Sequence, residues 1–138
     1  MSLKNYCFTI NSYHQAAEVI TIFKKNKIVP VLYIKYYLIN GLGMDWLNEL
    51  KNMLLREFKS NDFKTYIDVR KNYGLFISLV EQKINFIKIQ ANQDILKRLG
   101  QIGKLNKVLI NPNFSVIDLS KSKNLRTKLK NYIIKYNS

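Results

Sequence analysis

The sequence of 138 residues predicts an α/β fold with a parallel sheet of about five strands. Short apolar or β-branched segments alternate with longer segments of helical periodicity, which is typical of parallel sheets with right-handed crossovers. The segment 28–34 is almost continuously apolar, as expected of a strand buried on both faces. We therefore expect a three-layer, flavodoxin-like sandwich with helices on both faces of the sheet. Half of a (βα) barrel is the alternative.

The strands are predicted from β-branched and aromatic residues bounded by turn residues. They cover 5–10, 28–37, 64–69, 84–90 and 107–111, and a further short extended piece covers 114–119. Residues 40–43 (Asn-Gly-Leu-Gly) predict a loop. Because no linker or change in composition divides the chain, residues 1–138 are expected to form one domain.

The helices are predicted from apolar periodicity and from capping residues. They cover 13–25, 45–58, 73–82, 93–102 and 121–135. Ser12 and Gln15 have the spacing of a capping box, and Asn92 and Ser120 are predicted N-caps. Gly103 stands where a glycine cap would end the fourth helix.

Composition argues against several function classes. A single cysteine (Cys7) and a single histidine (His14) are too few for a disulfide or for a Cys/His metal site. We expect Cys7 to be a small buried side chain, and no metal or cofactor is expected. No apolar run is long enough to span a bilayer, and no secretory leader is evident, so a cytoplasmic location is expected.

Polar residues at the predicted strand ends mark the expected ligand site, because open α/β sheets bind ligands outside the carboxyl ends of their strands. The loop that contains Gly41 and Gly43 joins this edge and offers backbone N–H groups for a small anion, although a turn that needs glycines for its geometry is the simpler interpretation. The candidate ligand-binding residues are Asn11, Gly41, Gly43, Asp68, Gln90 and Asn111. The expected crevice is rich in amides and largely neutral, with Asp68 orienting a hydroxyl or an amine.

Three activities known from such folds fit this edge poorly. A phosphoacceptor receiver domain has an Asp at the position of Asp68, but here the acidic pair that would hold its metal ion is missing, and Asn111 and Pro112 end the fifth strand. The Gly41-Leu42-Gly43 segment lacks the third glycine of a dinucleotide fingerprint, and no Walker A motif is present. No pair of carboxylates offers acid–base chemistry, and although His14 lies within one helical turn of this edge, a lone histidine on a helix is more often packed or solvent-facing than catalytic. We therefore expect a domain without catalytic residues.

The net charge of +14 allows a second interpretation. Residues 70–138 hold 14 of the 23 basic residues and three of the nine acidic ones. Lys121, Lys128 and Lys135 recur every seven residues and predict a basic stripe on the last helix. An electrostatic module for RNA or an acidic partner is therefore one alternative function, and a self-associating domain such as a homodimer is another. The abundance of Lys, Ile and Asn also favours a simple compositional bias.

Three short motifs resemble a small uncharacterised family of bacterial α/β proteins, found mainly in alphaproteobacteria. They are Gly43-Met-Asp-Trp-Leu-Asn-Glu-Leu50, Tyr66-Ile-Asp-Val69 and, six residues after Asp68, Gly74. The likeness spans about Phe8 to Leu125. Val69 and Arg70 stand where the family has Cys-Gly, and Tyr73 stands where it has Pro. The resemblance implies the fold and points to Asp68, Gly74 and Trp46, but it implies no activity.

Overall fold

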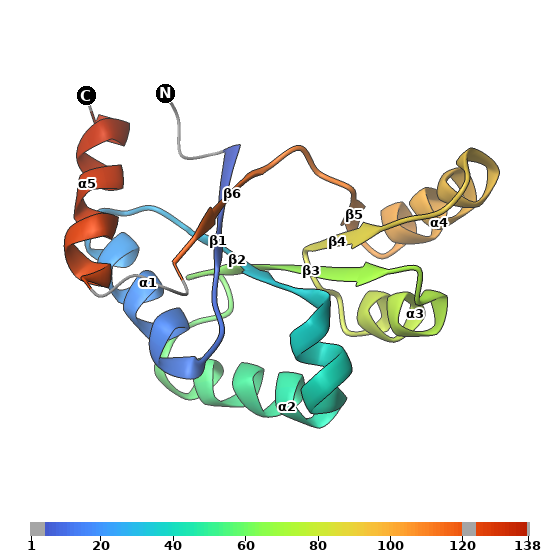
Figure 1. Cartoon of the computed structure of the whole chain (residues 1–138), viewed down its shortest axis with the longest axis horizontal. Helices are drawn as coiled ribbons and strands as arrows, with labels where there is room; N and C mark the ends of the chain where they lie inside the picture. Colours follow the sequence, from blue (N-terminus) through green and yellow to red (C-terminus); the bar gives the residue numbers. More distant parts are fainter. Residues whose placement is uncertain (1–4, 120–123, 138) are drawn as a thin grey trace.

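Six parallel strands form one sheet in the order β5-β4-β3-β2-β1-β6, which confirms the predicted α/β class (Figure 1). The computed structural model describes residues 5–119 and 124–137. The strands are β1 (Tyr6–Thr9), β2 (Val31–Ile34), β3 (Lys64–Arg70), β4 (Phe86–Ile89), β5 (Leu109–Ile110) and β6 (Ser115–Asp118). The helices are α1 (Tyr13–Lys25), α2 (Tyr36–Glu57), α3 (Tyr73–Glu81), α4 (Gln93–Leu105) and α5 (Leu125–Asn137).

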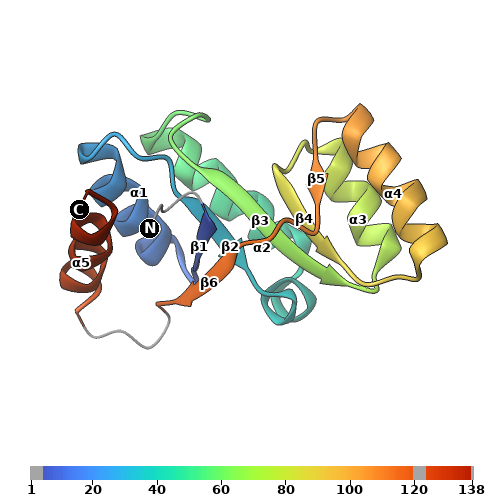
Figure 2. The ribbon, with the colours of Figure 1, turned by 90° about the horizontal axis from the view of Figure 1, so that it is seen from above.

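The first five strands lie side by side in sequence order, whereas β6 returns to pair with β1. The order departs from the flavodoxin order 2-1-3-4-5 and shares with the half-barrel alternative the sequential arrangement of β1 to β5. Figure 2 shows the β5–β6 connection crossing in front of β3, with α2 behind the sheet. The connections from β1 to β5 advance across the sheet in one direction, whereas the β5–β6 connection runs back in the other. A right-handed connection that runs back must cross the opposite face of the sheet.

The two faces of the sheet carry different cores. One apolar cluster contains the buried side chains of all five helices and, from the strands, Phe8, Leu32, Ile34, Ile67, Val69, Ile87, Ile89 and Ile117. We call this side the helix face. On the other side a smaller cluster contains Cys7, Val31, Tyr33 and Tyr66, against which Phe86 and Phe114 pack. We call this side the tyrosine face, and Phe114 from the β5–β6 connection covers part of it.

The α2 segment departs most from the predicted elements. The second strand ends at Ile34, so the prediction that it reaches residue 37 is wrong, and α2 begins at Tyr36. Residues 40–43 are helical up to a kink at Gly43, whose φ of 84° lies outside the helical region. The loop prediction therefore holds only for this kink. Leu38 and Ile39 are buried in the helix-face cluster, and this packing favours helix over strand.

Capping residues begin α1 and α4 as predicted, at Ser12 and Asn92, and Asn72 caps α3 without having been predicted, whereas the predicted end of α4 is wrong. The side chains of Ser12, Asn72 and Asn92 each accept a hydrogen bond from the first turn of the following helix. Helix α4 continues past Gly103 to Leu105, with Asn106 as its C-cap. The predicted cap at Ser120 lies outside the described residues. No helix in the described ranges is both long and apolar enough to cross a bilayer.

Candidate functional site

Asp68 links β2 to the carboxyl end of β3. It lies on the tyrosine face, where its Oδ2 accepts a 3.3 Å hydrogen bond from the Tyr33 hydroxyl of β2. Its Oδ1 accepts a 2.9 Å bond from the backbone N–H of Arg70. Burial raises the pKa of the Tyr33 phenol, and the negative charge of Asp68 raises it further. Tyr33 therefore keeps its proton and is the hydrogen-bond donor. The hydroxyl that Asp68 orients is thus one of the protein's own.

Arg70 has an unusual backbone conformation that Asp68 helps to hold. Its φ of 50° lies in the left-handed region, and the β3–β4 pairing shifts register between Asp68 and Arg70. The Arg70 carbonyl accepts a 2.8 Å bond from the Gln90 backbone N–H, which fixes the turn from its other side. The guanidinium lies over the Tyr36 ring at 5.4 Å from its centroid, a cation–π arrangement. Backbone and side chain of Arg70 are therefore both restrained.

A hollow of about 460 Å³ opens beside this turn, and we call it the carboxyl-edge hollow. Its lining consists of Tyr36, Arg70, Lys71, Asn72 and Gln90. These residues come from α2, from the turn between β3 and α3, and from the end of β4. Asn72 caps α3, so the positive end of that helix dipole lies beside the hollow. The lining offers two cations and neutral hydrogen-bonding groups, and no carboxylate.

Of the six predicted ligand-binding residues, Gln90 lines this hollow and Asp68 positions its Arg70. Asn111 lies one strand away, where its side-chain oxygen accepts a 2.8 Å bond from the Ile89 backbone N–H. Asn11 follows β1, three strand spacings from β4, or about 14 Å at the usual spacing. Its backbone N–H donates to Gln15, and its buried Oδ1 has no hydrogen-bond partner among the described residues.

Gly41 and Gly43 lie in α2, and neither lines one of the hollows described here. A Cβ at either position would meet nothing within 4 Å. The positive φ of Gly43 accounts for a glycine there, whereas Gly41 has no such backbone requirement. The geometry supports the simpler interpretation of this segment, namely a kink that needs one glycine.

The mouth of the site is more basic than the sequence suggested. Arg70 and Lys71 line the carboxyl-edge hollow, so the prediction of a largely neutral crevice is wrong there. Arg70 and Lys71 directly follow the predicted third strand, and their position after a strand end was the available signal. Tyr36 was predicted at this edge, near the end of the second strand, whereas the structure places it at the start of α2.

The strand order reverses between β1 and β6, which is where such folds usually place ligands. His14, Gln15 and Glu18 line a hollow there together with residues 124–127 of the start of α5. Glu18 forms an ion pair with Arg126 across it, so the arginine charge is already neutralised. Among the described residues that line this hollow, the arginine is thus already paired and no lysine is present.

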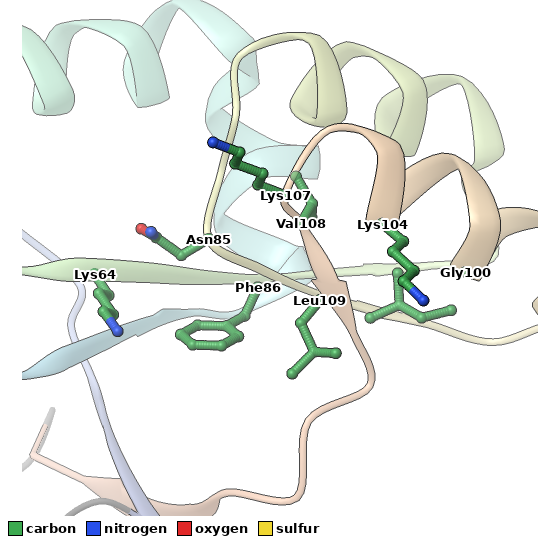
Figure 3. Close-up of a pocket in the computed structure, with 9 residues that line it drawn as sticks. Lys64, Asn85, Phe86, Gly100, Lys104, Lys107, Val108 and Leu109 are labelled. Carbon is green, nitrogen blue, oxygen red and sulfur yellow. The ribbon is translucent and has the colours of Figure 1, made fainter.

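A second hollow, of about 530 Å³, lies at the opposite edge of the sheet, and we call it the amino-edge hollow (Figure 3). It is lined by Lys64, Asn85, Phe86, Gly100, Lys104, Lys107, Val108, Leu109 and Ile110. Sequence reasoning missed this site because it looked only at the carboxyl ends of the strands.

The predicted basic stripe on the last helix is only partly described. Lys128 lies half-buried on α5, whereas Lys121 and the side chain of Lys135 lie outside the described residues. The stripe remains a prediction. Cys7 is fully buried, as predicted, and burial raises the pKa of its thiol to about 12. Among the described residues, no three His, Cys, Asp or Glu side chains gather as metal ligands would.

No protein-family model, no curated protein and no solved structure matches the chain. The resemblance to the bacterial α/β family stays a prediction.

Proposed function

We propose that this protein is a small-ligand-binding α/β domain that takes an oxyanion, such as a phosphate group, in the carboxyl-edge hollow. The observation that carries the proposal is the restrained Arg70, which shares the lining with Lys71 and Gln90 and with no carboxylate. Guanidinium and ammonium groups are the usual partners of phosphate, and a pre-organised arginine loses little side-chain entropy on binding.

The proposed site lies at the carboxyl ends of β3 and β4, the edge at which α/β sheets bind ligands. Arg70 and Lys71 supply charge, the Gln90 amide and the Tyr36 hydroxyl supply hydrogen bonds, and the start of α3 supplies a favourable dipole. Asp68 acts behind the site as a positioning residue for the Arg70 turn. The lining holds no pair of groups suited to acid–base chemistry, which favours binding without catalysis.

Calorimetric titration with pyrophosphate tests this proposal. We expect one saturable site, and we expect Arg70→Asn to weaken binding about tenfold, since a charge-assisted hydrogen bond contributes about 1.5 kcal/mol. Asn tolerates the left-handed conformation, so the backbone turn is kept. Arg98→Gln, on an exposed position of α4, is the matched control. Equal affinity in the parent protein and in Arg70→Asn would reject the site.

The electrostatic module and the self-associating domain remain the alternative functions. The electrostatic module would be favoured if the protein binds a single-stranded RNA and if each single lysine substitution lowers that affinity by a similar factor. A dimer in light scattering that persists at low protein concentration would favour self-association. Neither alternative predicts a specific effect of Arg70.

A further inference from the structure

The amino-edge hollow combines an apolar floor with three lysines in its lining, on residues that the proposed oxyanion site does not use. Figure 3 shows Phe86 and Leu109 side by side, with Lys64 on one side and Lys104 on the other. Phe86 pairs in register with Tyr66 of β3 and with Leu109 of β5, so the three side chains form one row across the tyrosine face. Phe86 and Leu109 of this row form the floor of the hollow.

The aromatic part of this floor is held in place. Phe114 packs edge-on against the Phe86 ring at 5.0 Å between centroids, and Tyr66 does so at 6.3 Å. The Lys64 ammonium lies 5.9 Å from the centroid of the same ring. Beside this fixed ring, Leu109 is 57% exposed. An exposed leucine next to a fixed half-buried phenylalanine leaves apolar surface that a planar ligand would cover.

The charge around the floor has a single sign. Lys64, Lys104 and Lys107 come from β3, from α4 and from the turn between α4 and β5, and no carboxylate lines the hollow. None of the three forms an ion pair with a described acidic residue. The Asn85 oxygen is engaged by the Thr65 backbone N–H, so it does not compensate the lysines. An anion placed among these ammonium groups would relieve their mutual repulsion.

We propose that the amino-edge hollow is a second binding site, for a small organic anion whose aromatic or other flat apolar body bears a phosphate or carboxylate group. The body would cover Phe86 and Leu109, and the anionic group would lie toward Lys64 and Lys104. Gly100 contributes to the room available, because its lack of a side chain leaves space on the α4 wall beside Ile110. This proposal stands whether or not the carboxyl-edge hollow binds an oxyanion.

Calorimetric titration with three probes tests the proposal: 1-naphthyl phosphate, inorganic phosphate and uncharged 1-naphthalenemethanol. We expect the naphthyl phosphate to bind one site at least tenfold more tightly than either fragment. The Lys64→Gln and Lys104→Gln variants are each expected to weaken binding about three- to fivefold, the upper range for a partly exposed charge pair. Lys97→Gln, two turns earlier on α4 and outside the hollow, is the matched control. Repeating the titration in Arg70→Asn separates this hollow from the carboxyl-edge hollow.

Leu109→Glu is a second variant that tests the same site from its floor. Because Leu109 is exposed, the fold tolerates the change, and the new carboxylate is expected to abolish binding of naphthyl phosphate while leaving the melting temperature unchanged within about two degrees. Naphthyl phosphate bound no better than inorganic phosphate would overturn the proposal. So would equal binding of the uncharged alcohol, unchanged affinity in the Lys64→Gln and Lys104→Gln variants, or binding that survives in Leu109→Glu.

Discussion

The Tyr33 hydroxyl donates a hydrogen bond of 3.3 Å to Asp68 Oδ2, while Asp68 Oδ1 accepts from the Arg70 backbone. A tyrosine of β2 thereby fixes a carboxylate of β3, and the carboxylate in turn fixes the left-handed turn that presents Arg70. From the sequence, Asp68 was expected to bind the ligand, and this link assigns it the role of shaping the site. The carboxylate shapes the site, and the neighbouring cations are proposed to bind the ligand.

Substitutions at Asp68 distinguish positioning from charge. Asp68→Asn keeps an oxygen that accepts from Arg70 and removes a negative charge near the proposed anion, so pyrophosphate affinity is expected to stay equal or to rise. Asp68→Ala removes the acceptor, and we expect affinity to fall severalfold although a repelling charge is gone. The free energy of unfolding should fall by about 1–2 kcal/mol. Tighter binding by Asp68→Ala would show that charge alone matters.

The two glycines of α2 are expected to respond in opposite ways to alanine. Gly43 has φ 84° and ψ 172°, a conformation that side chains other than glycine avoid, so Gly43→Ala should destabilise the fold by about 1–3 kcal/mol. Gly41 is helical and exposed, so Gly41→Ala should stabilise it by about 0.5–1 kcal/mol. Urea unfolding followed by circular dichroism measures both. Loss of stability in Gly41→Ala would mean that its backbone needs glycine.

A second pair of glycines, on α4, tests the packing of α4 against β5. A Cβ at Gly103 would lie 2.6 Å from the Val108 carbonyl oxygen, so Gly103→Ala should cost about 1–3 kcal/mol of stability. A Cβ at Gly100 would meet Ile110 Cδ1 at 3.6 Å, an ordinary contact. Gly100→Ala should therefore stabilise the helix by about 0.5–1 kcal/mol. A similar effect of the two changes on thermal unfolding would contradict the close approach at Gly103.

Alkaline pH is expected to destabilise the tyrosine face. Burial raises the pKa of Cys7 from 9.0 to about 12 and that of Tyr66 from 10.0 to about 12. Each of these groups is neutral in the folded protein and has a lower pKa in the unfolded chain. Its contribution to the free energy of unfolding is therefore complete at pH values below the pKa of the unfolded chain. That contribution is lost as the pH rises toward the pKa of the folded protein. The urea midpoint should therefore fall steadily from pH 9 to pH 11.

Cys7→Ala is the control for this pH dependence. It should remove the part of the decline that begins near pH 9 and leave the part that begins near pH 10, which belongs to the tyrosines. The buried thiol should also react with an alkylating reagent only after unfolding. A urea midpoint that stays constant up to pH 11 would be inconsistent with burial of these groups.

Much of the fold could be predicted because local signals agreed with tertiary packing. Ser12, Asn92 and the β-branched strands each satisfy a rule that operates within a few residues. The predictions failed where contacts between residues far apart in the sequence determine the secondary structure. The aromatic run after Ile34 favours strand by propensity, yet burial of Leu38 and Ile39 makes it helical. The fifth strand is only two residues long, between Lys107 and Asn111, both of which have positive φ.

The candidate site was predictable in position but not in composition. Strand ends are visible in the sequence, so Gln90 and Asp68 could be placed at the carboxyl edge of the sheet. The turn that presents Arg70 depends on a register shift between β3 and β4 and on a bond from Tyr33, which is 35 residues from Asp68. The amino-edge hollow depends on the pairing of β3, β4 and β5 with the end of α4, for which no local sequence signal exists.

The proposed oxyanion site is tested most directly by a two-dimensional ¹H–¹⁵N NMR titration of the protein with pyrophosphate. We expect saturable shifts of the backbone amides of Arg70, Lys71, Asn72 and Gln90 with a common dissociation constant, which should be about tenfold higher in Arg70→Asn. Shifts that grow without saturation, or that centre on other lysine-rich surfaces while these four amides stay unmoved, would contradict the proposed function.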